Sequence, residues 1–243
     1  MLIKRYKEKG TKERHAACGK WYGSERRKVM EFICCALLAY LIGTFNPSYF
    51  LAAAKGFDIR KRGSGNAGAS NVIIVFGKAV GAVCALLDIG KACFAIWVTG
   101  KLFADFSLAF PVAAVMCIIG HIFPFYMKFK GGKGLACLGG VILMYSPKVF
   151  AVMLLLELVI VLIVDYLCVV PMSAAAAFPV VYGVMDQDMI GMSIMFVVTV
   201  VMCIKHIENL RRIKNGTEVH FSFLWNKDKE IARIKENGAT EGE

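Results

Sequence analysis

Three polar segments interrupt an otherwise apolar chain, and all three combine residue types that suit the binding of phosphate. They lie at residues 63–71 (GSGNAGASN), 121–134 (HIFPFYMKFKGGKG) and 205–209 (KHIEN). Glycines let backbone N–H groups approach an anion closely, and neighbouring lysine or arginine side chains supply positive charge. Each segment adjoins an apolar stretch of membrane length, so together they predict a phosphate-handling site at one face of a membrane.

The first two segments have plain structural alternatives. Residues 63–71 lead into a Val-Ile-Ile run, which indicates a loop entering a helix, with backbone N–H groups, Ser64 and Asn66 around an anion. A glycine-rich turn with ordinary helix caps gives the same pattern. The Lys130–Gly134 run would also suit a flexible connector. It lacks the spacing of a nucleotide-binding P-loop and follows no strand, which argues against a soluble nucleotide-binding domain.

The third segment places ionisable side chains at helical spacing. His206, Asn209 and Arg212 share one face of a helix, although the wet end of a membrane helix would show the same pattern. Asp88 and Lys91 are three residues apart in an apolar stretch. Ionisable residues in such a place face the protein interior and pair with each other.

Composition and hydropathy predict the fold class. The chain has 243 residues, of which 58% are hydrophobic, and a mean hydropathy of +0.60. These values are typical of an all-α, polytopic integral membrane protein. We expect about seven membrane helices, some short or broken, at about 30–54, 79–101, 107–127, 134–146, 148–168, 171–185 and 189–205.

The net charge of +11 lies mainly in loops and tails between apolar segments, which argues against nucleic acid as a partner. With seven crossings, the strongly basic loops and all three polar segments fall on one side, and the positive-inside rule makes that side cytoplasmic. The nine cysteines show no CxxC pair or Cys/His ligand spacing, so neither a zinc site nor a disulfide framework is expected.

The first 29 residues contradict this topology, because they hold ten Lys or Arg and would lie outside. We therefore expect Met30 to be the translation start, which mass spectrometry of the native N-terminus would test. The predicted organisation is a basic extension over residues 1–29, a membrane domain over residues 30–218 and a polar C-terminal tail over residues 219–243.

Together and in this order, the motifs resemble the acyl-phosphate-dependent glycerol-3-phosphate acyltransferase family of bacterial inner membranes. The resemblance covers about residues 30–218. The matching residues are Ala39-Tyr40-Leu41-Ile42-Gly43 with Asn46-Pro47, Asp58-Ile59-Arg60, the GSGNxGAxN core from Gly63 to Asn71, Leu87-Asp88 with Lys91, His121-x-Phe123-Pro124, Phe129-x-Gly131-Gly132-Lys133-Gly134 and His206-x-x-Asn209.

The resemblance implies transfer of a fatty acyl group from acyl phosphate to the 1-position hydroxyl of glycerol 3-phosphate, giving lysophosphatidate and phosphate for phospholipid synthesis. It implies catalytic roles for Ser64, His206 and Asn209, with His206 as proton acceptor, oriented by Asn209 or Glu208, unless a substrate phosphate takes the proton. The implied phosphate-binding residues are Arg60, Gly63, Gly65, Asn66, Asn71, Lys91, Gly131, Gly132, Lys133, Arg212 and Glu218.

Neither metal nor coenzyme is implied. The expected partners are acyl phosphate, glycerol 3-phosphate, membrane lipid and the soluble enzyme that makes acyl phosphate. Other glycerolipid acyltransferases use His-x-x-x-x-Asp, but the fifth residue after each of the four histidines is Lys20, Tyr126, Arg211 or Trp225.

Several positions depart from the family pattern. Ile74 stands where the family has Arg, and Asp165-Tyr166-Leu167-Cys168-Val169 replaces Arg-Tyr-x-Ser-Leu. Lys205 replaces Arg and Cys137 replaces Thr. Lys78 would compensate for Ile74 if the two residues lay one helical turn apart. These departures leave open a divergent or inactive paralogue with another acceptor, and a transporter of a phosphorylated solute is the alternative from another class.

Overall fold

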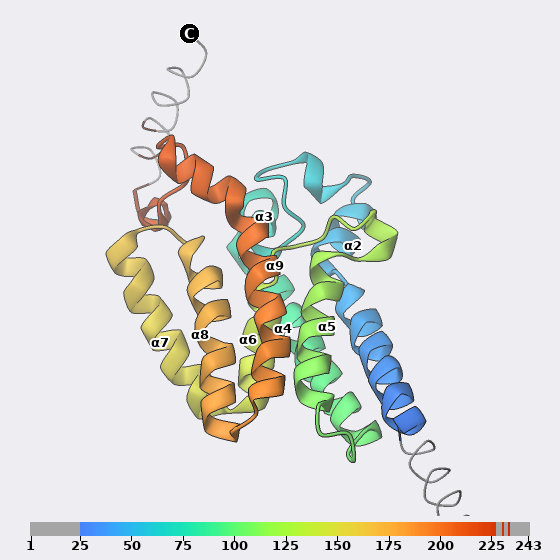
Figure 1. The fold of residues 1–243 in the computed structure, drawn as a ribbon. Coiled ribbons are helices and arrows are strands. Elements are labelled where there is room, and N and C mark those ends of the chain that lie inside the picture. The colour runs from blue at the N-terminus through green and yellow to red at the C-terminus, as the bar shows by residue number, and fades with distance from the viewer. Residues whose placement is uncertain (1–24, 227–229, 231–232, 234–243) are drawn as a thin grey trace, which may run out of the picture.

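The computed structural model describes residues 25–226, 230 and 233, and every regular element in that part of the chain is helical (Figure 1). A helix over residues 25–44 comes first. It is followed by α2 (Pro47–Ala54), α3 (Ala69–Phe76), α4 (Lys78–Leu102), α5 (Ala109–Ile122), α6 (Leu135–Tyr145), α7 (Pro147–Val164), α8 (Val169–Asp186) and α9 (Met189–Lys214). Short 3-10 helices are η1 (Ile59–Lys61), η2 (Phe125–Met127) and η3 (Phe221–Leu224).

Six segments within the described residues are long and apolar enough to cross a membrane: Glu25–Ala54, Lys78–Leu102, Ala109–Met127, Pro147–Val164, Val169–Asp186 and Met189–Lys214. A seventh apolar helix, α6, has only 11 residues. At 1.5 Å per residue it rises about 16 Å, roughly half of a hydrocarbon core of about 30 Å. The predicted all-helical membrane fold, with about seven helices of which some are short, is therefore confirmed.

Local sequence explains where several helices begin. Asn46 accepts a hydrogen bond from the Tyr49 backbone at 2.8 Å and precedes Pro47, which suits the first position of α2. Ser146 and Pro147 begin α7 in the same way, and Asp188 caps α9 by accepting from Gly191 at 2.8 Å. Pro179, in contrast, lies inside α8 and does not divide it.

The helices approach closely where glycines face a neighbour. A Cβ atom added to Gly43 would overlap the Cys117 backbone, and one added to Gly120 would overlap the Tyr40 carbonyl oxygen. Small residues of this kind allow membrane helices to pack backbone to backbone. The N-terminal helix and α5 therefore form a tight pair, which joins a core that also includes Phe178 of α8.

Gly77 separates α3 from α4 and overturns one expectation. Its φ of 93° is left-handed, so α3 ends at Phe76 and a new helix begins at Lys78. A Cβ added to Gly81 of α4 would meet Ile73 and the Ala69 carbonyl of α3, so the two helices lie side by side. The expectation that Lys78 lies one helical turn from Ile74 is wrong, because no continuous helix joins them.

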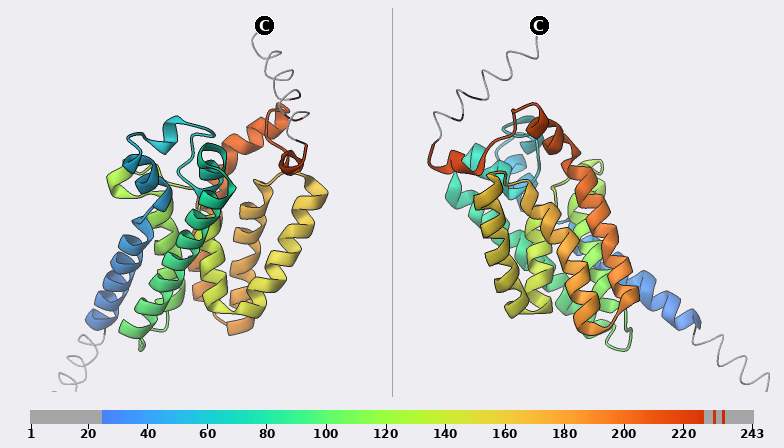
Figure 2. Two further views of the ribbon diagram at one scale, coloured as in Figure 1. Left: turned by 180° about the vertical axis from the view of Figure 1, so that it is seen from behind. Right: turned by 60° about the vertical axis from the view of Figure 1, so that its left-hand side comes forward.

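The three polar segments of the sequence lie at the same end of the bundle. Figures 1 and 2 show the loop between α2 and α3, the loop between α5 and α6, and the C-terminal half of α9 at this end. The first helix, drawn in blue, begins at the opposite end, as an odd number of crossings requires. Most of the predicted N-terminal extension, residues 1–24, lies outside the described residues.

Candidate functional site

The glycine-rich loop before α3 is organised by one buried amide. The Asn71 side chain accepts a hydrogen bond from the Ser64 N–H at 2.7 Å and donates to the backbone carbonyls of Ile59, Arg62 and Asn66 at 2.8–3.0 Å. Gly63 has a φ of 58°, and a Cβ there would overlap the Asn71 side chain. Asn71 is fully buried, so it shapes this loop from beneath.

The outer part of the loop remains accessible. Gly63, Ser64 and Gly65 are exposed, and Asn66 is half-buried. Gly68 precedes α3 with no side-chain cap on the helix. The Ser64 N–H is bonded to Asn71 and the Gly65 N–H to the Arg62 carbonyl, so the Ser64 hydroxyl is the accessible polar group of this outer part. The predicted binding of an anion here stays a prediction.

Arg60 fastens this loop to the loop between α5 and α6. Its Nε and Nη2 atoms donate to Asp58 at 2.6–3.1 Å, and its Nη1 atom donates to the Met127 carbonyl at 2.6 Å and the Lys130 carbonyl at 3.2 Å. The bonds from Arg60 hold the pKa of the Asp58 carboxyl below its usual value. Most of the guanidinium hydrogens are used in this clamp.

The loop over residues 123–134 folds back against the end of α5. Gly131 donates its N–H to the Ile122 carbonyl at 2.9 Å, and Gly132 donates to the His121 carbonyl at 3.1 Å. A Cβ at Gly132 would overlap the His121 ring. Both glycines are buried, so they serve close packing of backbone on α5 and present Lys133 toward α9.

Lys133 joins this loop to the third polar segment. Its ammonium group donates to the Asn209 side-chain oxygen. The Asn209 amide donates to Glu218 at 2.6 Å, and Arg212 Nε donates to the other Glu218 oxygen at 2.7 Å. Burial lowers the pKa of the Lys133 ammonium, and the positive charge of Arg212 lowers it further. An entering anion would relieve this repulsion between the two cations.

His206 lies one helical turn before Asn209 and is buried. Its Nδ1 atom lies 2.7 Å from the Met202 carbonyl oxygen. A carbonyl accepts only, so Nδ1 carries the hydrogen, and in the neutral ring Nε2 is left as a proton acceptor. The Met202 carbonyl therefore orients the ring, in place of the expected Asn209 or Glu208. Glu208 is exposed and pairs with Arg211 at 3.6 Å.

Asp88, Lys91 and His121 form a separate buried cluster, and the predicted pairing of Asp88 with Lys91 is confirmed. The Lys91 ammonium lies 2.6 Å from Asp88 Oδ1 and 2.9 Å from His121 Nδ1, and it donates to the Phe45 carbonyl. Lys91 is thus surrounded by groups of the protein itself, and its ammonium group is buried. Asp88, His121 and Cys137 are the one group of potential metal ligands among the described residues, and the Lys91 ammonium already supplies positive charge there.

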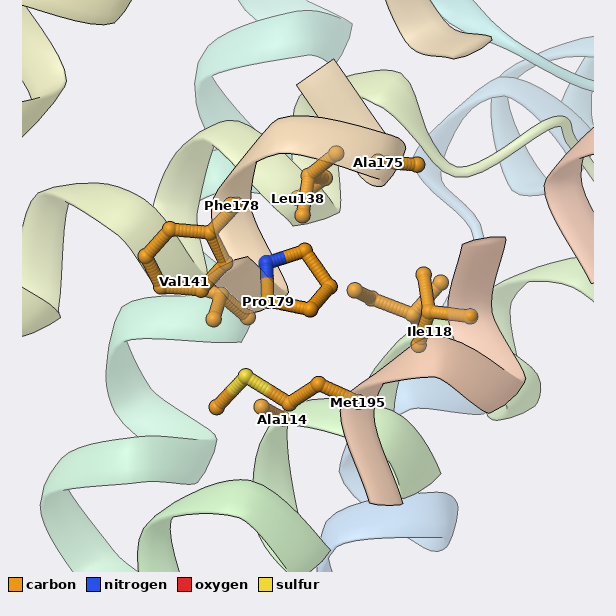
Figure 3. A pocket seen from close by; sticks show the side chains of 9 residues that line it. Ala114, Ile118, Leu138, Val141, Ala175, Phe178, Pro179 and Met195 are labelled. Atoms are coloured by element: carbon orange, nitrogen blue, oxygen red, sulfur yellow. The ribbon is translucent and has the colours of Figure 1, made fainter. Parts of the chain in front are cut away.

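An apolar cavity of about 10 Å³ lies between α5, α6, α8 and α9 (Figure 3). Ile118, Phe178 and Met195 are among its lining residues, and none of those residues is ionisable. Its volume is about that of a single water molecule. The cavity is therefore a packing gap in the apolar core.

Sequence reasoning missed two features of this site. Asp58 completes the Arg60 clamp, and its spacing of two residues from Arg60 in a loop carries little signal. Glu230 and Arg233 lie in the stretch expected to be a polar tail, yet Glu230 is buried and Arg233 contacts the residues after α9. A run of mixed charges near a chain end gives no indication of such contacts.

Known proteins resemble this chain over most of its length. A family model described as glycerol-3-phosphate acyltransferase matches residues 33–216. Glycerol-3-phosphate acyltransferase 2 of Thermotoga maritima is 37% identical over 183 residues, which cover 75% of this chain and 92% of the relative. The glycerol-3-phosphate acyltransferase of Geobacter sulfurreducens is 36% identical over 185 residues, which cover 76% and 94%.

Two solved structures have the same fold. The crystal structure of PlsY, an integral membrane glycerol 3-phosphate acyltransferase, in its glycerol 3-phosphate form superposes with a TM-score of 0.72 at 30% identity. Its lysophosphatidic acid form gives a TM-score of 0.70 at 29% identity. Each comparison covers 79% of this chain and 96% of the PlsY chain.

The lowered pKa of Lys133 predicts a pH-dependent anion affinity. Sulfate remains a dianion at neutral and alkaline pH, so only the protein titrates. Because the ammonium form exists below its pKa, sulfate affinity should fall as pH rises, beginning below the ordinary lysine value of about 10.4. Calorimetric titration of the protein in nanodiscs measures this. Lys133→Met should abolish the pH dependence and Lys214→Met, at an exposed position, should keep it. If sulfate affinity depended on pH in the Lys133 variant as it does in the wild type, Lys133 would not be the titrating group.

Proposed function

The chain belongs to the membrane glycerol-3-phosphate acyltransferase family, and we propose that it takes its acyl group from acyl phosphate. The reaction joins the acyl group to the 1-position hydroxyl of glycerol 3-phosphate and releases lysophosphatidate and inorganic phosphate. Both substrates then carry a phosphate group, so the site needs two places for anions.

One observation carries this proposal: two different anion-binding features meet through a single loop. The first is the exposed Ser64 hydroxyl on the glycine-rich loop before α3, and the second is the cationic pair Lys133 and Arg212. Arg60 bonds the first feature to the loop that bears Lys133. Two phosphates bound in this way would lie side by side, as transfer between them requires.

We assign glycerol 3-phosphate to the Lys133 and Arg212 side, because the proton acceptor must reach its hydroxyl. His206 precedes Asn209 by one turn of α9, and Asn209 accepts from Lys133. We assign acyl phosphate to the glycine-rich loop, because backbone N–H groups at the start of α3 favour a negative charge. The direct contacts proposed are those of Gly63, Ser64, Gly65, Asn66, Lys133 and Arg212.

The step balances without a coenzyme. The hydroxyl oxygen of glycerol 3-phosphate attacks the acyl carbonyl carbon while His206 Nε2 takes its proton. The tetrahedral intermediate collapses, the carbon–oxygen bond to phosphate breaks, and the electron pair leaves on the phosphate. Donors of the glycine-rich loop stabilise the departing phosphate, and His206 later returns its proton to phosphate or water.

Other predicted site residues act by shaping the site. Asn71 holds the glycine-rich loop, Arg60 holds the two loops together, and Gly131 and Gly132 seat the second loop on α5. Lys91 completes the buried cluster with Asp88. Glu218 fixes Asn209 and Arg212. We propose positioning roles for these residues, since their polar groups are already bonded within the protein.

Two departures bear on turnover. Ile74 is 60% exposed on α3 and offers no charge where the family has Arg. Cys168 stands where the family has Ser, directly before α8, and burial raises its thiol pKa to about 11. A neutral thiol is a weaker hydrogen-bond donor than a hydroxyl. We propose that the chain works with a weaker hold on its substrates than relatives that keep Arg and Ser.

Purified protein supplied with acyl phosphate and glycerol 3-phosphate should release phosphate and lysophosphatidate in equal amounts. Acyl-CoA should not replace acyl phosphate, and its use as the better donor would refute the proposed donor. His206→Gln should lower kcat by about 10²- to 10³-fold, because the general base is lost. Glu208→Gln serves as control and should keep wild-type kcat. An unchanged kcat in the His206 variant would show that His206 is not the proton acceptor, and a substrate phosphate would then take that role.

Ile74→Arg should raise kcat/KM. A restored charge-assisted hydrogen bond is worth about 1.5–3 kcal/mol, which corresponds to about tenfold or more. Ile74→Gln tests whether charge or mere polarity matters and should give little gain. Steady-state kinetics of the three proteins decides the matter, and equal kcat/KM values would show that the missing guanidinium does not limit this chain.

We propose that the polar end faces the cytoplasm. The described loops at this end carry Lys55, Lys61, Arg62, Lys128 and Lys130, whereas the linkers between α4 and α5 and between α8 and α9 contain Asp105 and Asp188. The asymmetry of these loops follows the positive-inside rule, whereas Arg26, Arg27 and Lys28 at the start of the first helix lie at the opposite end and count against it. A cysteine placed at Ser64 should resist a membrane-impermeant thiol reagent in intact cells and react after lysis. Labelling of this cysteine in intact cells would show that the polar end faces the outside of the cell.

A further inference from the structure

Residues 215–226, which follow α9, fold back over the ends of α7 and α8 (Figure 1). Its attachment point is Asp165, which follows α7 with a left-handed φ of 59°. The Asp165 carboxylate accepts from the Ser222 N–H and hydroxyl, both at 2.8 Å, and its carbonyl accepts from the Phe221 N–H at 2.7 Å. Asp165 is one of the residues that depart from the family pattern, and here it anchors this segment.

Arg233 closes the same segment on itself. It donates to the carbonyl oxygens of Gly216 and Glu218, the latter at 2.6 Å, and to both carboxylate oxygens of Glu230 at 2.6 and 3.1 Å. Glu230 is 5% exposed and also accepts from the His220 N–H at 2.8 Å. The hydrogen bonds from Arg233 hold the pKa of Glu230 at about 2, so the pair stays ionised throughout the neutral range.

These contacts converge on the turn that carries Glu218. Arg233 grips the backbone on both sides of Thr217, and the Glu218 side chain reaches from this turn to Asn209 and Arg212. Asn209 in turn accepts from Lys133. An unbroken series of hydrogen bonds thus runs from Arg233, through Glu218, to the cations assigned to glycerol 3-phosphate.

We propose that Arg233 and Glu230, anchored through Asp165 and Ser222, are positioning residues for the glycerol 3-phosphate side of the site. This inference rests on the proposed function for the identity of the ligand. The family model ends at residue 216, so Glu230 and Arg233 lie outside the region that this chain shares with it. We call the set Asp165, Ser222, Glu230 and Arg233 the C-terminal brace.

The brace acts on binding more than on the chemical step. When Glu218 is not held, Arg212 and Asn209 lose their shared partner and Lys133 loses a fixed acceptor. Affinity for the phosphate group falls because the cations must be ordered again on each binding event. His206 is held independently by the Met202 carbonyl, so its role as proton acceptor is retained.

The test is Arg233→Gln in the full-length protein in nanodiscs. The KM for glycerol 3-phosphate should rise about fivefold to tenfold, with kcat within twofold of wild type, because ground-state binding alone is weakened. Arg233→Lys should restore part of the loss, since it keeps the charge but not the planar fork. Ser222→Ala should show a smaller change in the same direction, because the N–H bond to Asp165 remains. Lys214→Gln is the matched control and should leave KM unchanged.

Sulfate affinity, measured by calorimetry, separates this inference from the proposed function. It should fall by a similar factor in Arg233→Gln whichever acyl donor the enzyme uses. If the wild-type protein is inactive with acyl phosphate, the proposed donor is refuted. The role of the C-terminal brace still holds in that case, provided that Arg233→Gln binds sulfate more weakly than the wild type. Unchanged sulfate affinity and KM in Arg233→Gln would overturn the brace. So would a loss of kcat that Arg233→Lys does not relieve, because a general folding defect has that result.

Discussion

The contact between the Lys133 ammonium and the Asn209 side chain is the one on which the site depends. Lys133 lies on a loop that Gly132 seats against His121, and Asn209 lies on the last membrane helix. On the other side of this loop, Arg60 bonds two of its carbonyls and so brings in the glycine-rich loop. Three segments far apart in sequence thus become one surface, with the loop between α5 and α6 as their common member.

Lys91 and Lys133 were both predicted to bind phosphate, but their surroundings differ, and this difference is why we propose a binding role for Lys133 alone. Lys91 is 7% exposed and bonded to Asp88 and a backbone carbonyl, with His121 alongside. Removing one partner of a buried ion pair commonly destabilises a protein by about 3–5 kcal/mol, so this cluster belongs to the framework. Lys133 is half-buried, faces Arg212 and has a lowered pKa, so it gains most from an anion.

The sequence predicted the membrane helices and the location of the three polar segments at one end of the bundle. Long apolar runs and the glycine-rich loops between them are strong local signals. The spacing of Asp88 and Lys91 similarly predicted their pairing. The break at Gly77 was missed, since one glycine between two apolar runs is compatible with a continuous helix. The roles of Asp58, Glu230 and Arg233 were missed because each depends on a tertiary contact that leaves no periodic trace. The orientation of His206 by a backbone carbonyl has no side-chain signature at all.

The shortness of α6 has a consequence for how a lipid product leaves. A helix of 11 residues spans only about half of the hydrocarbon core, and α6 joins α7 at the end opposite the polar segments, so part of the loop before α6 lies within the membrane layer (Figure 1). A single-chain phospholipid formed beside this loop has its tail among the neighbouring acyl tails from the start. It can diffuse away sideways, with no passage through water and no carrier, and the next acyltransferase can collect it from the same monolayer.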